Sequence, residues 1–105
     1  MRAPNGQGCT ISWHRELSLT LAADIVWRCV PELRQAHKER KSILFMLEAR
    51  EEQYMKQHIP GDTSLAEKFR LFLNEAFERK RLPYRLDGGL GEVRGHFYGF
   101  RVIEA

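Results

Sequence analysis

Two groups of positively charged side chains in this 105-residue sequence have the composition of a phosphate-binding surface. Arg34, Lys38 and Lys41 recur at helical spacing, which places them on one helix face. The second group begins at Arg79 and continues toward the C-terminus. Arginine and lysine bind phosphate oxygens whatever the base sequence, and aromatic side chains add a surface for base stacking. The candidate nucleic-acid-binding residues are Arg34, Lys38, Lys41, Arg79, Lys80, Arg81, Arg85, Arg94, His96 and Tyr98.

Catalytic chemistry has one candidate set, near the C-terminus. Arg85, Arg94, His96 and Tyr98 are residue types with which a small ribonuclease moves protons and stabilises charge on phosphate. No second acid or base partner for His96 stands out, so we expect a non-enzymatic protein, with a ribonuclease-type toxin as a less favoured alternative. The cysteines and histidines lack Cys-x-x-Cys and His-x-x-x-His spacing, and we expect neither a metal nor a cofactor.

A long helix is the first element expected to position these side chains. Residues 31–58 contain no glycine, and their only proline is at the first position, where its missing N–H has no cost. Most of the other residues are good helix formers. Pro60 and Gly61 follow directly and end the helix.

A further helix is predicted over residues 64–81. Ser64 and Glu67 have the spacing of a capping box at its start. The short connection between the two helices predicts an antiparallel pair, which would place Lys41 beside Arg81. The two positive groups would then meet at one end of the helical pair.

The C-terminal residues 82–105 predict a β-hairpin. Apolar and polar residues alternate on both sides of a glycine-rich break. A turn at residues 87–92 would set Arg85 opposite Arg94 and place both on the outer face, together with Tyr98. That face would extend the basic surface of the helices.

Two elements are expected before the long helix. Residues 16–30 are apolar around most of the helix circumference, which predicts a buried helix at the centre of the core. Residues 9–13 are β-prone and could add a short N-terminal strand, preceded by a loose lead-in over residues 1–8. The expected fold class is α+β, with three helices, the middle one long and antiparallel to the third, and a C-terminal β-hairpin.

The order of a helix, a basic helix end and a hairpin over residues 64–102 is similar to the recognition helix and wing of winged-helix DNA-binding proteins. The resemblance implies that a helix of this region would approach DNA with the hairpin beside it. It rests on the order of elements and on no sequence motif.

Length and composition fit a single domain over residues 1–105. Lysine and arginine exceed aspartate and glutamate by 17 − 14 = 3, so the chain is only mildly basic. No apolar run approaches the roughly 20 residues of a membrane-spanning helix, and the polar N-terminus lacks the apolar centre of a secretion signal. We therefore expect no membrane partner, a cytoplasmic location, and reduced thiols at Cys9 and Cys29.

The sequence thus predicts a small non-enzymatic regulatory protein that contacts nucleic acid through a basic patch. The main alternative is a protein–protein adaptor or inhibitor, such as one encoded by a mobile element and acting on a larger machine. That reading uses Arg40, Glu51 and His58, charged residues that share the apolar stripe of the long helix and would form a protein interface. A homodimer built on this stripe is a further alternative.

Overall fold

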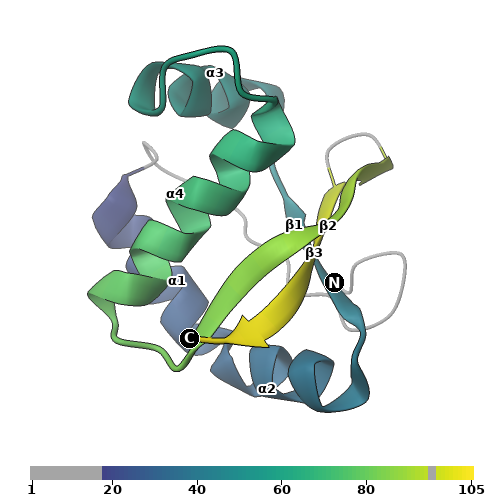
Figure 1. Ribbon diagram of the computed structural model, residues 1–105. Helices are drawn as coiled ribbons and strands as arrows, with labels where there is room; N and C mark the ends of the chain where they lie inside the picture. The colour runs from purple at the N-terminus through teal and green to yellow at the C-terminus, as the bar shows by residue number, and fades with distance from the viewer. Residues whose placement is uncertain (1–17, 95–96) are drawn as a thin grey trace.

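The described residues of the computed structural model, 18–94 and 97–105, form four helices and one three-stranded antiparallel sheet (Figure 1). The side chains of residues 89–94 are outside this description, as are the lead-in and the N-terminal strand expected over residues 1–13. The α+β class is confirmed, with four helices in place of three. The elements are α1 (Leu19–Arg28), α2 (Val30–Glu39), β1 (Ser42–Met46), α3 (Ala49–His58), α4 (Leu65–Arg79), β2 (Tyr84–Arg94) and β3 (Phe97–Glu104).

The long helix expected over residues 31–58 is wrong, because a strand interrupts it. α2 ends at Glu39, and the next residue, Arg40, takes a left-handed backbone conformation with a φ of 57°. The amide of Lys41 donates to the carbonyl of Ala36 at 2.9 Å, which closes the helix end. The chain therefore turns away from the helix axis before it reaches β1.

β1 is a short apolar run, Ser-Ile-Leu-Phe-Met, whose three central residues are buried. Such a run is typical of a strand buried on both faces. β1 pairs with β3 along its whole length, from Ser42 opposite Arg101 to Met46 opposite Phe97. This pairing across the sheet overrides the helix propensity of the charged residues on either side.

β2 and β3 form the predicted hairpin, but its turn is not at residues 87–92. β2 continues to Arg94, and the connection at residues 95–96 lies outside the described residues. Arg85 is opposite Ile103, so the expected pairing of two arginines does not occur. The glycine-rich segment is instead part of β2, where the register shifts, because glycine accommodates irregular strand geometry as readily as a turn.

α4 supplies the centre of the core, and packs against α1, α3 and β2 (Figure 1). The helix predicted over residues 16–30 does not have this central role. In its described part, α1 buries only Ala22, Ala23 and Val26, and its Trp27 is 56% exposed. α1 packs mainly against α4, with a smaller contact to α2. The buried residues of α4 are Lys68, Phe69, Phe72, Leu73, Ala76 and Phe77.

Half of the capping box predicted at the start of α4 is present. The hydroxyl oxygen of Ser64 accepts a hydrogen bond from the amide of Glu67 at 3.2 Å. The Glu67 carboxylate binds the Arg70 guanidinium, with Arg70 Nε 2.8 Å from Glu67 Oε1. This bond holds the pKa of Glu67 below its usual value of 4.5.

The Glu67–Arg70 pair predicts a pH dependence of stability. The folded protein binds the Glu67 proton less readily than the unfolded chain does, so the contribution is present above pH 4.5 and is lost as pH falls through the lower folded pKa. We expect Glu67→Gln to remove less than about 1 kcal/mol at neutral pH, because solvent screens the pair. Urea unfolding of the wild type and of Glu67→Gln at about pH 6 and about pH 3 measures the contribution of the pair to stability. The wild type should lose more stability than the variant between these two pH values. An equal loss of stability in the two proteins would contradict the prediction.

Cys29, at the end of α1, is disulfide-bonded, so the expectation of a reduced thiol is wrong for this residue. A disulfide needs only that the fold bring two sulfur atoms together, which cysteine spacing alone does not reveal. Cys9 lies outside the described residues. Of the helices that the structure describes, none has both the length and the apolarity to cross a membrane.

Candidate nucleic-acid interface

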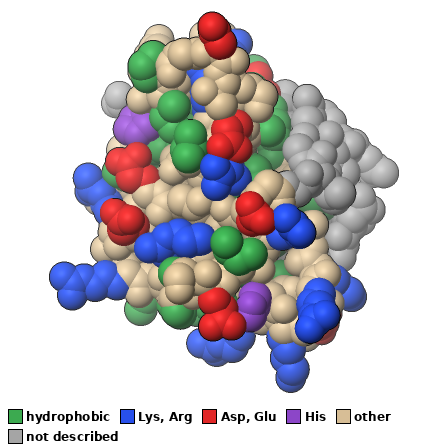
Figure 2. All heavy atoms as spheres, in the orientation of Figure 1, with side chains coloured by type: hydrophobic (Ala, Val, Ile, Leu, Met, Phe, Trp, Pro, Cys, Tyr) green, Lys and Arg blue, Asp and Glu red, His purple; other side chains and the backbone are tan. Residues whose placement is uncertain are grey.

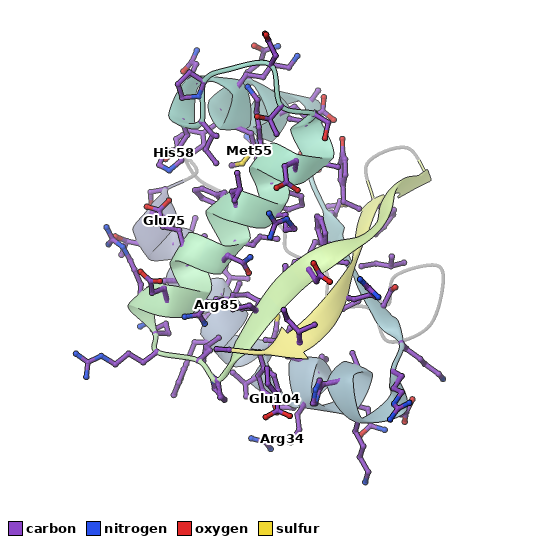
Figure 3. The ribbon with its side chains drawn as sticks, in the orientation of Figure 1. Arg34, Met55, His58, Glu75, Arg85 and Glu104 are labelled. Carbon is purple, nitrogen blue, oxygen red and sulfur yellow. The ribbon has the colours of Figure 1, made fainter. Side chains whose placement is uncertain are left out.

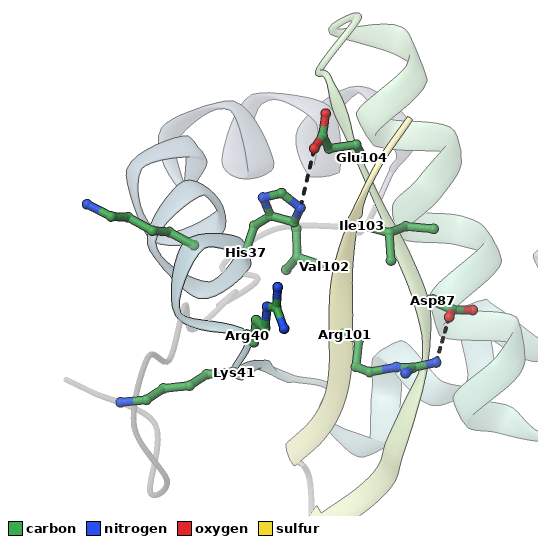
Figure 4. A pocket seen from close by; sticks show the side chains of 9 residues that line it. His37, Arg40, Lys41, Asp87, Arg101, Val102, Ile103 and Glu104 are labelled. Atoms are coloured by element: carbon green, nitrogen blue, oxygen red, sulfur yellow. Dashed lines mark hydrogen bonds and ion pairs between the residues drawn. The ribbon is translucent and has the colours of Figure 1, made fainter.

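A hollow of about 580 Å³ opens between the C-terminal end of α2 and the last residues of β3 (Figure 4). We call it the α2–β3 hollow. Four of its nine lining side chains are lysine or arginine and two are acidic, so its potential is positive. The lining residues are His37, Lys38, Arg40, Lys41, Asp87, Arg101, Val102, Ile103 and Glu104.

The path of the chain explains why α2 and β3 meet. A two-residue connection joins α2 to β1, and the first residue of β1, Ser42, is opposite Arg101 of β3. The ring of His37 packs at a tilt against Tyr84 of β2, with the ring centroids 5.7 Å apart. His37 Nε2 also lies 3.8 Å from Glu104 Oε1. The end of α2 is therefore fixed beside the end of the sheet.

Arg101 is a residue of this hollow that the sequence prediction missed. Its Nη2 lies 2.7 Å from the Asp87 carboxylate, and its Nε donates to the carbonyl of Gly88 at 3.2 Å. The alternation of side chains along a strand could have identified it, since an arginine between the buried Phe100 and Val102 has to face away from the core. The wrong hairpin register hid this alternation.

Lys41 has an acidic partner on the surface. Its Nζ lies 3.3 Å from Glu39 Oε1. Hydrogen bonds from Gln35 and then from Lys41 hold the pKa of Glu39 below its usual value of 4.5, so this carboxylate is charged at neutral pH. A surface pair of this kind is weak, and Lys41 can exchange its partner for a phosphate.

Arg34, Lys38 and Arg40 differ from Lys41, because no carboxylate of the described residues forms an ion pair with them. All three side chains are exposed, and Arg34 and Lys38 are one helical turn apart on α2. Figure 3 shows Arg34 near the lower edge of the molecule, below Glu104, and Figure 2 shows several lysine or arginine side chains along that edge. This edge therefore carries exposed cations without an ion pair among the described residues.

The second predicted basic group does not join the first, because the antiparallel long-helix pair that would connect them does not exist. Arg79 Nη1 donates to the hydroxyl of Thr20 at 3.4 Å, and Lys80 Nζ lies 3.0 Å from the Asp24 carboxylate. Arg81 is exposed after the end of α4 and does not line the α2–β3 hollow. Arg79 and Lys80 thus attach α4 to α1.

The C-terminal residues expected on an outer sheet face do not share one. Tyr98 is 2% exposed, and its hydroxyl donates to the Glu52 carboxylate at 3.2 Å. Arg85 Nη1 donates to two backbone carbonyls at 3.0 and 2.7 Å. The side chains of Arg94 and His96 lie outside the described residues. Of the expected ribonuclease-type set, the structure therefore describes only Arg85 and Tyr98, and each binds a partner within the fold.

The three residues expected at a protein interface do not lie on one stripe. Arg40 is in the connection after α2, whereas Glu51 and His58 are on α3. Glu51 is 2% exposed and accepts a hydrogen bond from the amide of Glu48 at 3.2 Å, which makes it part of the helix start. His58 stacks on Tyr54 with ring centroids 5.5 Å apart. β1 separates the segments that a continuous helix would have aligned.

α4 takes the place of the recognition helix in the winged-helix resemblance, but its outer side is acidic. Glu75 and Glu78 are exposed on this side of the helix, as is Leu71 one turn earlier. Carboxylates on such a surface repel phosphate. The resemblance therefore stays one of element order, and the positive surface is on α2 and β3 instead.

Over the part of the chain that the structure describes, no group of three or more histidine, cysteine or acidic side chains is placed to hold a metal ion. Comparison of the chain with protein-family models, with curated proteins and with solved structures finds no significant match.

Proposed function

We propose that this protein is a small non-enzymatic regulatory protein that binds nucleic acid with α2 and the end of β3. The residues proposed to contact phosphates are Arg34, Lys38, Arg40, Lys41 and Arg101. The observation that carries the proposal is that three of them are exposed without an ion-pair partner among the described residues. Cations of this kind bind phosphates with release of condensed counterions, which favours association.

Contacts of this type position a protein on a nucleic-acid backbone and carry no base-specific information. The five side chains come from α2, its connection to β1, and β3, and four of them line the α2–β3 hollow. We therefore propose binding with little sequence preference and a strong dependence on ionic strength.

The proposal is tested by fluorescence anisotropy of the full chain with labelled, mixed-sequence single-stranded DNA, single-stranded RNA and duplex DNA. If about four phosphates are neutralised, the logarithm of the duplex affinity should fall with the logarithm of salt concentration with a slope of about −3 to −4. No detectable binding to any of the three at about 50 mM salt would contradict the proposal.

A matched pair of double variants locates the surface. Arg34→Glu with Lys38→Glu should weaken duplex binding at least about tenfold and reduce the salt slope by about 2. Arg28→Glu with Lys56→Glu makes the same change in net charge on α1 and α3, where both side chains are also exposed without a described ion pair. This control should weaken binding by less than about threefold, because screening limits distant charges. Equal losses in the two double variants would contradict the assignment to α2.

A protein partner is the second candidate, and Trp27 favours it. Tryptophan is a frequent anchor of protein interfaces, and this side chain is 56% exposed on α1. If the wild type binds no nucleic acid, affinity purification with Trp27→Ala as the control tests this candidate. Light scattering over a range of concentrations tests whether the partner is a second copy of the chain.

A further inference from the structure

Arg40 occupies a backbone position that usually holds glycine. Its φ of 57° lies in the left-handed region, which residues other than glycine adopt at an energetic cost. Helices commonly end with glycine at this position for that reason. No described residue forms an ion pair or a hydrogen bond with the Arg40 guanidinium that would offset the cost. The hydrogen bonds that end α2 account for the backbone conformation, and the exposed guanidinium has no ion pair among the described residues.

The Arg40 side chain points into the α2–β3 hollow. Figure 4 shows it extending toward Val102, below the ring of His37, whereas Lys41 extends away from the hollow. Val102, which is buried, lies on the same side of β3 as His37 and Arg40, whereas the 42% exposed Ile103 points to the other side of the strand. The hollow thus combines a planar guanidinium, which can bind an anion with two parallel hydrogen bonds, with an aromatic ring and an apolar surface.

One of the two acidic residues of the hollow has an arginine partner, and the other is exposed to solvent. The Asp87 carboxylate lies 2.7 Å from Arg101 Nη2, and the Glu104 carboxylate lies 3.8 Å from His37 Nε2. An anion that enters the hollow can therefore contact the Arg40 guanidinium, while the Glu104 carboxylate is 77% exposed to solvent. The cavity volume of about 580 Å³ is within the range of roughly 300–1,000 Å³ that is usual for small-molecule sites.

We propose that the α2–β3 hollow binds the phosphate monoester of a nucleoside, with the phosphate on Arg40 and the nucleoside against the His37 ring. The ligand is either a free nucleotide or the phosphorylated end of a strand, which share this chemistry. The inference goes beyond the proposed phosphate-backbone binding, because a small ligand can occupy the hollow without contact to Arg34 or the rest of α2.

The test is calorimetric titration of the full chain with adenosine 5′-monophosphate, and with adenosine as the matched ligand that lacks phosphate. We expect the monophosphate to bind at least about tenfold more tightly than adenosine, and inorganic phosphate to compete with it. A short oligonucleotide with and without a 5′-phosphate forms the second arm. A larger gain in affinity from the 5′-phosphate of the strand than from the phosphate of adenosine monophosphate identifies a strand end as the ligand, and the reverse order identifies a free nucleotide.

Two glycine substitutions make a matched pair of variants. Arg40→Gly suits the left-handed backbone and removes the guanidinium, so it should unfold at a higher temperature than the wild type and bind the monophosphate at least about tenfold more weakly. Arg81→Gly makes the same change at the end of α4, where φ is 53° and the side chain does not line the hollow. It should also unfold at a higher temperature, with monophosphate affinity unchanged.

The inference fails if the monophosphate binds no more tightly than adenosine, or if the two glycine variants lose affinity equally. In both of these cases the hollow is not a ligand site. The proposed function would still hold if the protein binds mixed-sequence oligonucleotides in a salt-dependent way. Loss of oligonucleotide binding in Arg34→Glu with Lys38→Glu, with monophosphate binding retained, would support the hollow as a separate site.

Discussion

Replacing Phe69 with alanine is expected to lower the free energy of unfolding by about 3–5 kcal/mol, which is a large share of the 5–15 kcal/mol typical of a domain. Phe69 is fully buried on α4. Its ring makes edge contacts with Phe45 of β1 at 6.3 Å, Phe100 of β3 at 5.9 Å and Tyr98 of β3 at 5.6 Å between centroids. The substitution removes both the buried area and the contacts that join α4 to two strands.

Chemical denaturation monitored by circular dichroism measures this effect, and Leu71→Ala on the same helix is its control. The Leu71 side chain is 39% exposed, so its loss should cost less than about 1 kcal/mol. A Phe69→Ala variant with a stability within about 1 kcal/mol of the wild type would contradict the central role of α4 in the core.

Asn74→Ala is expected to lower the free energy of unfolding by about 2–3 kcal/mol, through hydrogen bonds rather than packing. The Asn74 side chain donates to the carbonyl of Leu86 at 2.9 Å and accepts from the amide of Leu86 at 2.7 Å. Leu86 is only 1% exposed, so its amide would lose its partner in a place that water scarcely reaches. Its carbonyl would keep the bond from Arg70 Nη1 at 3.1 Å.

Asn74→Asp separates the two hydrogen bonds of this contact. Aspartate keeps the acceptor for the Leu86 amide and loses the donor to the Leu86 carbonyl, so we expect a smaller loss of stability than in Asn74→Ala. Amide hydrogen exchange at Leu86 gives a local measurement, which should become faster in Asn74→Ala and change little in Asn74→Asp. Slow exchange at Leu86 in both variants would contradict the role of Asn74.

The Asn74 contact also affects the proposed ligand site. It holds Leu86 of β2 on α4, and the next residue, Asp87, binds Arg101 in the α2–β3 hollow. A shift of β2 would move the carboxylate that neutralises part of the hollow. Binding measurements on Asn74→Ala therefore need to be compared with those on Phe69→Ala, which weakens the core without changing this contact.

Several elements were predictable from the sequence because local chemistry determines them. The start of α4 depends on a serine oxygen and an amide three residues later, and both lie within one short segment. The hairpin was predictable from alternation over residues 82–105, although its register was not. Arg34, Lys38 and Lys41 were expected to share a face, and the structure places Arg34 and Lys38 on α2 with Lys41 just beyond its end.

Residues 42–46 show where local reasoning failed. Their neighbours favour a helix, and the run itself is too short to distinguish a buried strand from a helix turn. Only pairing with β3, which is more than 50 residues away in the sequence, makes the strand favourable. That single strand divided the expected long helix and with it the expected meeting of Lys41 and Arg81.

The sequence by itself determined the α+β class, the cap of α4 and the cationic character of α2, because each depends on residue types within a few positions of one another. Tertiary structure decided which cations meet. Arg101 comes close to α2 through the pairing of β1 with β3, and Arg40 points into the hollow because the chain must turn there to enter the sheet. Both facts follow from contacts between distant segments, which no local pattern records.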